Sequence, residues 1–240
     1  MSKNGQDEKN DEQINEENIV EKFLTLVRDQ PDEAIKEIEN QRTLISSQNV
    51  VNRESAILVA AKHGHLEFIK KLLEFQMFGR RIAKLDTKDI NGFTAFWWAV
   101  MNDHLETAFF LMDQGASLEE VESETGSNIL HYLLVKLDIK KSQENYSEKD
   151  LDIYYFFIEE IVKRLILKKK NDFLAELFFN ISENDQGLNV IAMAVEMGDV
   201  RATKILLENK AKVKSTIGSE KVNNTDLRNY IKNLQEKNQY

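Results

Sequence analysis

The 240-residue sequence contains no cysteine, one proline and only nine glycines. The absence of cysteine excludes disulfide bonds, thiol catalysis and cysteine-ligated zinc, and it is typical of proteins in a reducing compartment. The scarcity of proline and glycine argues against a β-sandwich, which needs many turns, and favours helices. With 42% hydrophobic residues, the chain has enough apolar material to bury a core.

Two further absences limit the classes of function. Lysine and arginine number 32 against 41 acidic residues, and the resulting net charge of −9 disfavours a general nucleic-acid binder. No apolar run reaches the ~18 residues of a membrane span, and the first thirteen residues, MSKNGQDEKNDEQ, lack the apolar core of a signal peptide. We therefore expect a cytoplasmic protein, or one secreted into a host cytosol without the usual signal peptide.

The stretch 89–119 has the local pattern of a turn followed by two helices. Asp89 and Gly92 bracket a tight turn, and Thr94 stands where a helix N-cap belongs. Apolar residues then recur at helical spacing, a second helix begins near His104, and Gly115 can end it by adopting a positive φ. The pattern recurs along the chain, with expected cap residues at Ser55, Thr94, Asn128 and Asn189.

This unit resembles the ankyrin repeat, which has about 33 residues and a T-P-L-H-x-A signature. The signature reads TAFWWA at 94–99 and SAILVAA at 55–61, and NILH at 128–131 is similar. The GHLE segment at 64–67 and the HLE segment at 104–106 match the start of the second helix of the family.

The resemblance implies an all-α fold, namely an ankyrin-repeat solenoid of stacked helix-turn-helix units, with four to five repeats and an insertion in the fourth. Each helix pair stacks on its neighbours because it cannot bury its apolar stripe alone. The expected boundaries are a disordered acidic tail at 1–17, repeats at about 19–49, 50–88, 89–122, 123–183 and 184–214, and a C-terminal cap helix and tail at 215–240.

Several irregular segments are expected within these repeats. Two short helices broken at Gln30-Pro31 form a degenerate first repeat. An enlarged loop at 77–84 accounts for the long spacing between Ser55 and Thr94. The fourth repeat is interrupted by a polar insertion at 138–150, a long amphipathic helix at 151–170 and a short helix at 172–179.

No residue pattern points to an active site. The chain has none of the phosphate-binding, dinucleotide-binding, serine-hydrolase or H-E-x-x-H metal motifs. The repeat positions of His65, His104 and His131 imply structural roles, and His63, expected on the groove, has no obvious second ligand for a metal. We therefore expect no catalytic residue, no cofactor and no metal.

The resemblance implies a non-catalytic scaffold, monomeric alone, that binds a partner protein and not nucleic acid. In the family, partners lie against the turn tips and the concave groove. The tip positions are Asn52, Glu54, Ile90, Asn91, Phe93, Glu124, Thr125, Ser127, Asp185, Gln186 and Leu188. The groove positions are Lys62, His63, Met101, Asn102, Val135, Lys136, Glu196 and Met197.

The third repeat is the expected hot spot, because Ile90, Phe93 and Met101 are apolar at positions that should meet water. Trp97 is expected to be half-exposed at the repeat interface, where it packs or anchors a partner, and Trp98 is expected in the core. On this interpretation Phe93→Ala or Met101→Ala weakens partner binding with little loss of stability.

Two alternatives stay open. The richness in Asn, Lys and Ile and the lack of Cys suggest, by analogy, an effector of an intracellular bacterium that acts in a host cell. Alternatively, the inserted segment 138–183 holds an active site or a docking site for another subunit. A deep polar pocket in that segment would favour an enzyme, and a defined oligomer would favour the docking site.

Overall fold

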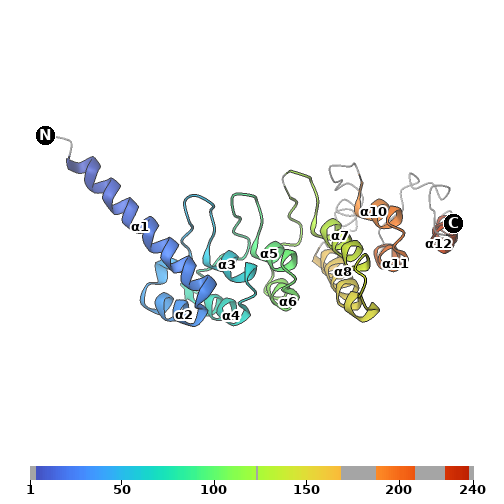
Figure 1. Ribbon diagram of the computed structural model, residues 1–240, viewed down its shortest axis with the longest axis horizontal. Helices are drawn as coiled ribbons and strands as arrows, with labels where there is room; N and C mark the ends of the chain where they lie inside the picture. Colours follow the sequence, from blue (N-terminus) through green and yellow to red (C-terminus); the bar gives the residue numbers. More distant parts are fainter. Residues whose placement is uncertain (1–3, 123, 169–187, 209–224, 238–240) are drawn as a thin grey trace. The chain divides into compact units, whose positions relative to one another are not determined.

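The computed structural model describes residues 4–122, 124–168, 188–208 and 225–237 (Figure 1). These residues belong to two compact units, 1–117 and 118–240. The described residues are helical apart from one two-stranded hairpin and the connecting turns. The expected all-α repeat fold is therefore confirmed. Within these ranges, no helix combines the length and apolar character that a bilayer crossing requires.

Unit 1 consists of helix pairs stacked in two layers (Figure 1). The pairs are α1 with α2, α3 with α4, and α5 with α6; α1, α3 and α5 pack in one layer, and α2, α4 and α6 in the other. The elements are α1 (Asn4–Asp29), α2 (Pro31–Asn40), the 3-10 turn η1 (Arg42–Ile45), α3 (Ala56–Lys62), α4 (Leu66–Glu74), β1 (Gln76–Met77), β2 (Arg80–Arg81), α5 (Ala95–Met101) and α6 (Leu105–Asp113).

The first helix is longer than the sequence suggested. The break at Pro31 lies where it was expected, with Pro31 opening α2. However, α1 begins at Asn4, so residues 4–17 are helical where a disordered acidic tail was expected. This segment contains no proline, and six of its fourteen residues are Glu or Gln, which are good helix formers, so the helix extends outward from the part anchored by buried Phe23 and Val27.

Helix caps follow the predicted pattern with one exception. The side chain of Thr94 accepts a hydrogen bond from the Trp97 amide, and that of Asn189 accepts one from the Ala192 amide. Asn128 forms a capping box with His131 at the start of its helix. The predicted cap bond of Ser55 is absent: its backbone is extended as at a cap, but its buried hydroxyl has no hydrogen-bond partner.

The turn between paired helices has a left-handed residue. Gly64 has φ +72, and a Cβ atom built on it would lie 2.5 Å from Nδ1 of His104 in the next repeat. Asp103, at the equivalent position one repeat later, has φ 61 although it is not glycine. The turn between paired helices therefore forms with either residue.

Gly64→Ala is expected to lower the free energy of unfolding by about 2 kcal/mol, because a left-handed residue with a Cβ costs about 1–2 kcal/mol and the His104 ring must also move. The matched change Asp103→Gly should raise it, by ~0.5 kcal/mol. Urea unfolding followed by tryptophan fluorescence measures both, since the two tryptophans of the chain, Trp97 and Trp98, lie in unit 1. Equal losses for the two variants would contradict this account.

Unit 2 is built from longer and less regular helices. They are α7 (Ile129–Lys141), α8 (Glu148–Lys168), α10 (Val190–Glu196), α11 (Val200–Glu208) and α12 (Thr225–Lys237). α7 packs on α8 and α10, and α11 packs on α8 and α10. α12 lies where a last helix was expected, with Leu227 and Ile231 buried.

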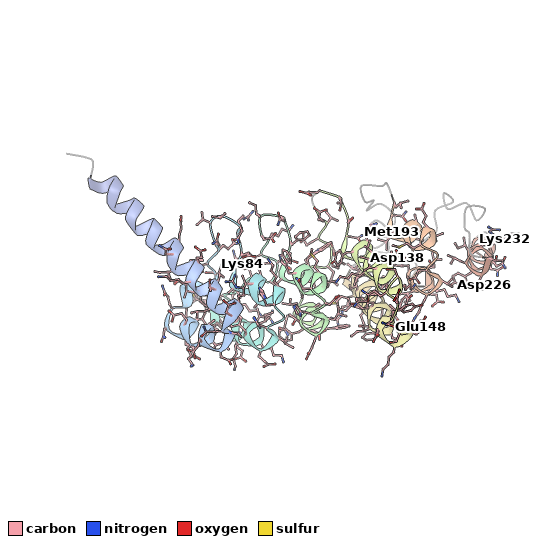
Figure 2. All side chains as sticks on the ribbon, in the orientation of Figure 1. Lys84, Asp138, Glu148, Met193, Asp226 and Lys232 are labelled. Atoms are coloured by element: carbon pink, nitrogen blue, oxygen red, sulfur yellow. The ribbon has the colours of Figure 1, made fainter. Side chains whose placement is uncertain are left out.

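The predicted insertion at 138–150 is wrong in its extent. Asp138 lies in the last turns of α7, and α8 already begins at Glu148, so only the connection 142–147 is not helical (Figure 2). Leu137 occupies the repeat position that Gly64 occupies between α3 and α4. Leu137 is buried inside α7 and is not a glycine that could end the helix, so α7 continues through this position. The short helix predicted at 172–179 lies outside the described residues.

Candidate functional site

The first turn tip of unit 1 is built by Asn49. Its side-chain oxygen accepts hydrogen bonds from the backbone amides of Val51 (2.8 Å) and Asn52 (3.2 Å). The backbone amide of Asn49 donates to the main-chain oxygen of Glu54 (2.8 Å). These bonds hold a local turn of the Asx type. As a result Val50 and Val51 are 62% and 81% exposed.

The second tip is built in the same way by Asp89. One carboxylate oxygen accepts hydrogen bonds from the amides of Asn91 and Phe93, both at 2.9 Å. Ile90, which follows Asp89 in this turn, is 61% exposed. Its backbone amide donates to Asn52 O of the first tip at 2.9 Å. Val50, Val51 and Ile90, which we call the tip surface, therefore stand on two turns that are joined through the main chain.

Charged and aromatic groups link these turns to the helices behind them. Lys62 donates to Glu54 Oε1 at 3.2 Å, and its Nζ lies 4.4 Å from the centroid of the Trp98 ring. The Trp98 indole donates to the second oxygen of Asp89 at 2.8 Å. Glu54 also accepts from the Asn52 side chain at 2.9 Å. Three predicted site residues of the second repeat, Asn52, Glu54 and Lys62, thus belong to one connected network.

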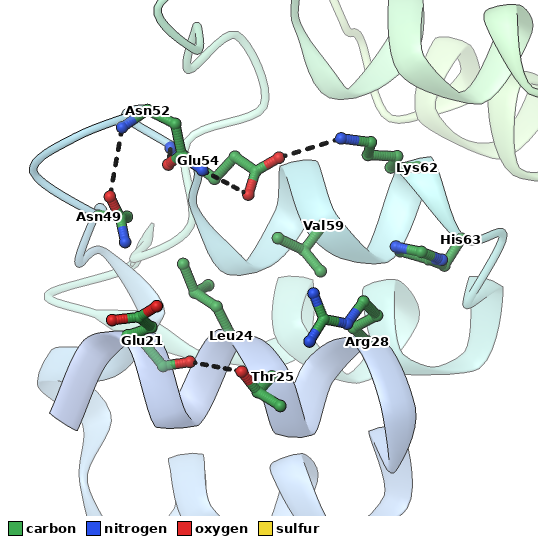
Figure 3. A pocket seen from close by; sticks show the side chains of 10 residues that line it. All are labelled: Glu21, Leu24, Thr25, Arg28, Asn49, Asn52, Glu54, Val59, Lys62 and His63. Atoms are coloured by element: carbon green, nitrogen blue, oxygen red, sulfur yellow. Dashed lines mark hydrogen bonds and ion pairs between the residues drawn. The ribbon is translucent and has the colours of Figure 1, made fainter. Parts of the chain in front are cut away.

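A polar cavity of about 190 Å³ lies beside this network, between α1, the first tip and α3 (Figure 3). Its lining brings together four residues predicted from the repeat pattern, Asn52, Glu54, Lys62 and His63. The contribution of α1 was missed, because a degenerate first repeat carries no signature to align. The missed lining residues are Glu21, Leu24, Thr25, Arg28, Asn49 and Val59.

His63 lies in a positively charged environment at the edge of this cavity. Its pKa is lowered first by desolvation and then by the charges of His65, Lys62, Arg28 and His104. His63 is therefore neutral near pH 7, stacked on the His65 ring with 5.9 Å between centroids.

The two tryptophans are placed opposite to expectation. Trp97 is 3% exposed, so it belongs to the core and presents no face to a partner. Trp98 is half-buried, with its indole held by Asp89. Phe93 packs on both rings, with centroids 5.5 Å from Trp97 and 5.6 Å from Trp98, so it is half-buried rather than free. Phe93→Ala would therefore disturb packing as well as any contact with a partner.

The other predicted residues of unit 1 lie at its surface. Asn91 and Asn102 are exposed, and Met101 is half-buried. The Asn102 side chain donates to Trp98 O at 3.0 Å, which closes the end of α5. Of the expected hot spot, only Ile90 presents a large exposed apolar side chain.

The predicted residues of unit 2 are dispersed among different roles. Thr125 and Ser127 are half-buried in a turn that the Glu122 carboxylate organises, with Glu124 exposed at its tip. The carbonyl of half-buried Leu188 contacts the His131 ring at 3.0 Å. On α7, Val135 is exposed and Lys136 is half-buried. At the end of α10, Glu196 is exposed and Met197 is half-buried. Asp185 and Gln186 lie outside the described residues.

Two of the histidines, His65 and His131, have structural partners. The His65 ring contacts Arg28 O at 2.8 Å, and the buried His131 ring completes the capping box of α7. Burial lowers the pKa of His131, although its contact with Leu188 O acts in the opposite direction. Among the described residues, no group of three or more His, Cys, Asp or Glu side chains is placed to hold a metal ion.

Comparison with known families agrees with this geometry. The family described as ankyrin repeats, in three copies, matches residues 15–122. Residues 15–122 belong to the ankyrin repeat family. Ankyrin repeats commonly mediate protein–protein interaction, and the family is typically non-enzymatic. No curated protein matches the sequence. The copies expected at 123–183 and 184–214 lie beyond the matched region and stay predictions.

Proposed function

We propose that unit 1 binds a partner protein through the tip surface and the adjoining polar cavity. The observation that carries this proposal is the exposure of Val51 and Ile90, 81% and 61%, on turns that are already hydrogen-bonded internally and to each other. Apolar side chains held in water on a rigid base are typical of interaction surfaces. The cavity supplies a polar rim, with Lys62 and Glu54 half-buried beside it.

The rigidity of the two tips favours binding without a large ordering cost. Asn49 and Asp89 satisfy the turn amides before any partner arrives, and the bond from the Ile90 amide to Asn52 O fixes the spacing of the tips. A preorganised surface loses less conformational entropy on association than a mobile loop does.

The double variant Val51→Ser with Ile90→Ser is expected to weaken partner binding at least tenfold, because both side chains would lose their apolar contacts. Stability should change little, since neither side chain is buried and the main-chain bonds remain. Affinity capture from native lysate, followed by titration of the purified partner, gives the measurement.

Leu167→Ser is the matched control, because Leu167 is 79% exposed but lies on α8 of unit 2. It should retain the partner at the level of the unchanged chain. Retention by the double tip variant, or equal loss in the control, would exclude the tip surface as the binding site.

A second candidate function concerns α8. Ile153 and Phe156 are 46% and 51% exposed and lie one helical turn apart, so this helix offers an apolar stripe to another subunit. Size-exclusion chromatography with light scattering tests it: a defined oligomer that Phe156→Ser converts to monomer supports docking there. Action as a bacterial effector in a host cell stays a prediction based on composition alone.

A further inference from the structure

A β-hairpin interrupts the repeat pattern of unit 1. β1 and β2 pair antiparallel, Gln76 with Arg81 and Met77 with Arg80, leaving Phe78-Gly79 as a two-residue turn. The hairpin lies in the segment that lengthens the spacing from Ser55 to Thr94 to 39 residues, against 34 from Thr94 to Asn128. The neighbouring repeat closes without it, so the stacking of helices does not require it.

The base of the hairpin is fixed to the body of unit 1. The Ile82 amide donates to Phe75 O at 3.1 Å, which extends the hairpin by one closing bond. Arg81 donates twice to Gln114, to its carbonyl at 3.2 Å and its side-chain oxygen at 2.6 Å. The Arg42 guanidinium lies 5.7 Å from the Phe75 ring centroid. The hairpin is therefore presented in one orientation.

The face of the hairpin opposite Arg81 carries solvent-exposed apolar side chains. Directly paired residues of a hairpin share one face, so Met77 lies beside Arg80, while Gln76 and Arg81 are on the anchored side. Met77 is 56% exposed, and Phe78, at the tip, is 97% exposed. This exposed fraction is the largest of any large apolar residue in the described part of the chain.

Phe78 is also unfavourable for the backbone. Phe78 has φ 52 and Gly79 has φ 73, which is the arrangement of a type I′ turn. Asn-Gly is the preferred pair in such turns, and a bulky residue at positive φ is strained. Phe78 thus opposes folding through both its exposed ring and its backbone. A residue that opposes folding in both ways is a candidate for a role outside the fold.

We propose that this hairpin is a second docking element, in which Phe78 enters an apolar pocket of a partner protein whose rim is acidic. Met77 widens the apolar contact, and Arg80 faces the acidic rim. The hairpin follows α4, whereas the tip surface lies on the turns that precede α3 and α5. The two surfaces share no residue, so this inference stands or falls independently of the proposed function.

The charges of the hairpin favour a different protein as its partner over an anionic membrane or a second copy of this chain. An anionic membrane attracts proteins through clusters of four to eight basic residues, whereas Arg81 is engaged with Gln114 and Arg80 is the one arginine on the exposed face. Association of two copies through their hairpins would leave each Arg80 without an acidic partner, because residues 76–81 contain no acidic side chain. An acidic rim on a different protein supplies that partner.

The first experiment replaces Phe78 in the full-length chain with the photo-reactive residue p-benzoylphenylalanine and cross-links it in native cells. The same residue at Leu167, which is 79% exposed, serves as the control position. Cross-links from position 78 to a distinct protein, absent from position 167, are expected. Cross-links to lipid or to a second copy of the chain, or none above the control, would overturn the proposal.

The captured protein is then purified and titrated with variants. Phe78→Asn should weaken its binding at least tenfold while the melting temperature stays unchanged or rises, because asparagine suits the turn. Phe78→Tyr should retain binding, Arg80→Glu should weaken it, and the tip variant Val51→Ser with Ile90→Ser should leave it unchanged. Equal affinity for Phe78→Asn and the unchanged chain would refute the hairpin as a docking element.

Discussion

Asp89→Ala is expected to lower the free energy of unfolding of unit 1 by about 3 kcal/mol, because three donors lose a charged acceptor at once. Asp89 is 4% exposed, and its carboxylate accepts from the amides of Asn91 and Phe93 and from the Trp98 indole. The hydrogen bonds from the two amides fix the second tip, and the hydrogen bond from the indole fixes the position of the Trp98 ring. The substitution therefore removes both the turn and the placement of the half-buried aromatic ring.

A double-mutant cycle separates these two contributions. Asp89→Asn leaves one oxygen for the turn amides, but its amide group cannot accept from the Trp98 indole. Trp98→Phe removes the indole donor, so Asp89→Asn should destabilise less in that background. Urea unfolding followed by tryptophan fluorescence reports the cycle, because Trp97 remains in unit 1. Equal effects in both backgrounds would show that the 2.8 Å contact contributes nothing measurable.

Asp89→Ala should affect partner binding indirectly, through the position of Ile90. Asp89 is buried and does not touch a partner, but it orients Ile90 on the tip surface. Asp89→Ala is thus expected to weaken partner binding together with stability. By contrast, the double change at Val51 and Ile90 should weaken binding alone, which distinguishes a supporting residue from a contacting one.

The turns and caps of the fold could be predicted because they depend on local chemistry. Thr94, Asn128 and Asn189 cap helices because each has a side-chain oxygen within reach of free amides of the first turn. Another local signal was present but missed. Ser147 and Asp150 exchange hydrogen bonds at the start of α8, a serine and an acidic residue three positions apart. Recognising that pair would have placed the start of α8 correctly.

The burial of the two tryptophans depends on contacts distant in sequence, and the signature alone predicted it incorrectly. Trp97 occupies the signature position that His131 occupies in a later repeat, and both residues are buried. Trp98 needs an acceptor for its indole N–H, and Asp89, nine residues earlier, supplies it at the edge of the core. The ring then lies under Lys62 of the preceding repeat, a contact that no local pattern shows.

The candidate site was predictable only in part for the same reason. Repeat phase located Asn52, Glu54, Lys62 and His63, which do line one cavity. The wall supplied by α1 was not predictable, since Glu21 and Arg28 belong to a repeat without the signature. The hairpin was predicted only as an enlarged loop, because Phe-Gly is not among the pairs that mark a type I′ turn.

Asp199→Ala is expected to lower the free energy of unfolding of unit 2 by about 3 kcal/mol, the lower end of the range for breaking a buried ion pair. Asp199 is 6% exposed, while its partner Lys141 is a third exposed, which places the effect at that lower end. Lys141 Nζ donates at 2.8 Å, the Tyr155 hydroxyl at 3.0 Å and the Ala202 amide at 2.9 Å. One carboxylate thus connects α7, α8 and α11.

A matched control is available between two of the same helices. Asp152 of α8 and Arg201 of α11 form an ion pair in which both side chains are at least half-exposed. Asp152→Ala removes an equal charge but should cost less than about 1 kcal/mol, as exposed pairs do. The six tyrosines of the chain all lie in unit 2, so tyrosine absorbance follows its unfolding while tryptophan fluorescence follows unit 1.

The pH dependence of this effect follows from the two groups that donate to Asp199. Burial alone would lower the pKa of Lys141, but hydrogen bonds to Asp199 and Tyr155 outweigh it and raise the pKa above its ordinary 10.5. Burial, with the charge of Asp199, raises the pKa of Tyr155 above its ordinary 10.0 despite the opposing hydrogen bond with Lys141. Both groups hold their protons more tightly in the folded state than in the unfolded state.

The stability that these protons contribute is therefore fully present below about pH 10 and is lost as the pH rises through the folded-state pKa values. The gap in stability between the unchanged chain and Asp199→Ala should accordingly be widest near neutral pH and narrow in the alkaline range. Far-UV circular dichroism in urea at a series of pH values measures it. A gap that stays constant to high pH would mean that Asp199 acts through its bond to the Ala202 amide alone, as a cap on α11, and not by joining three helices.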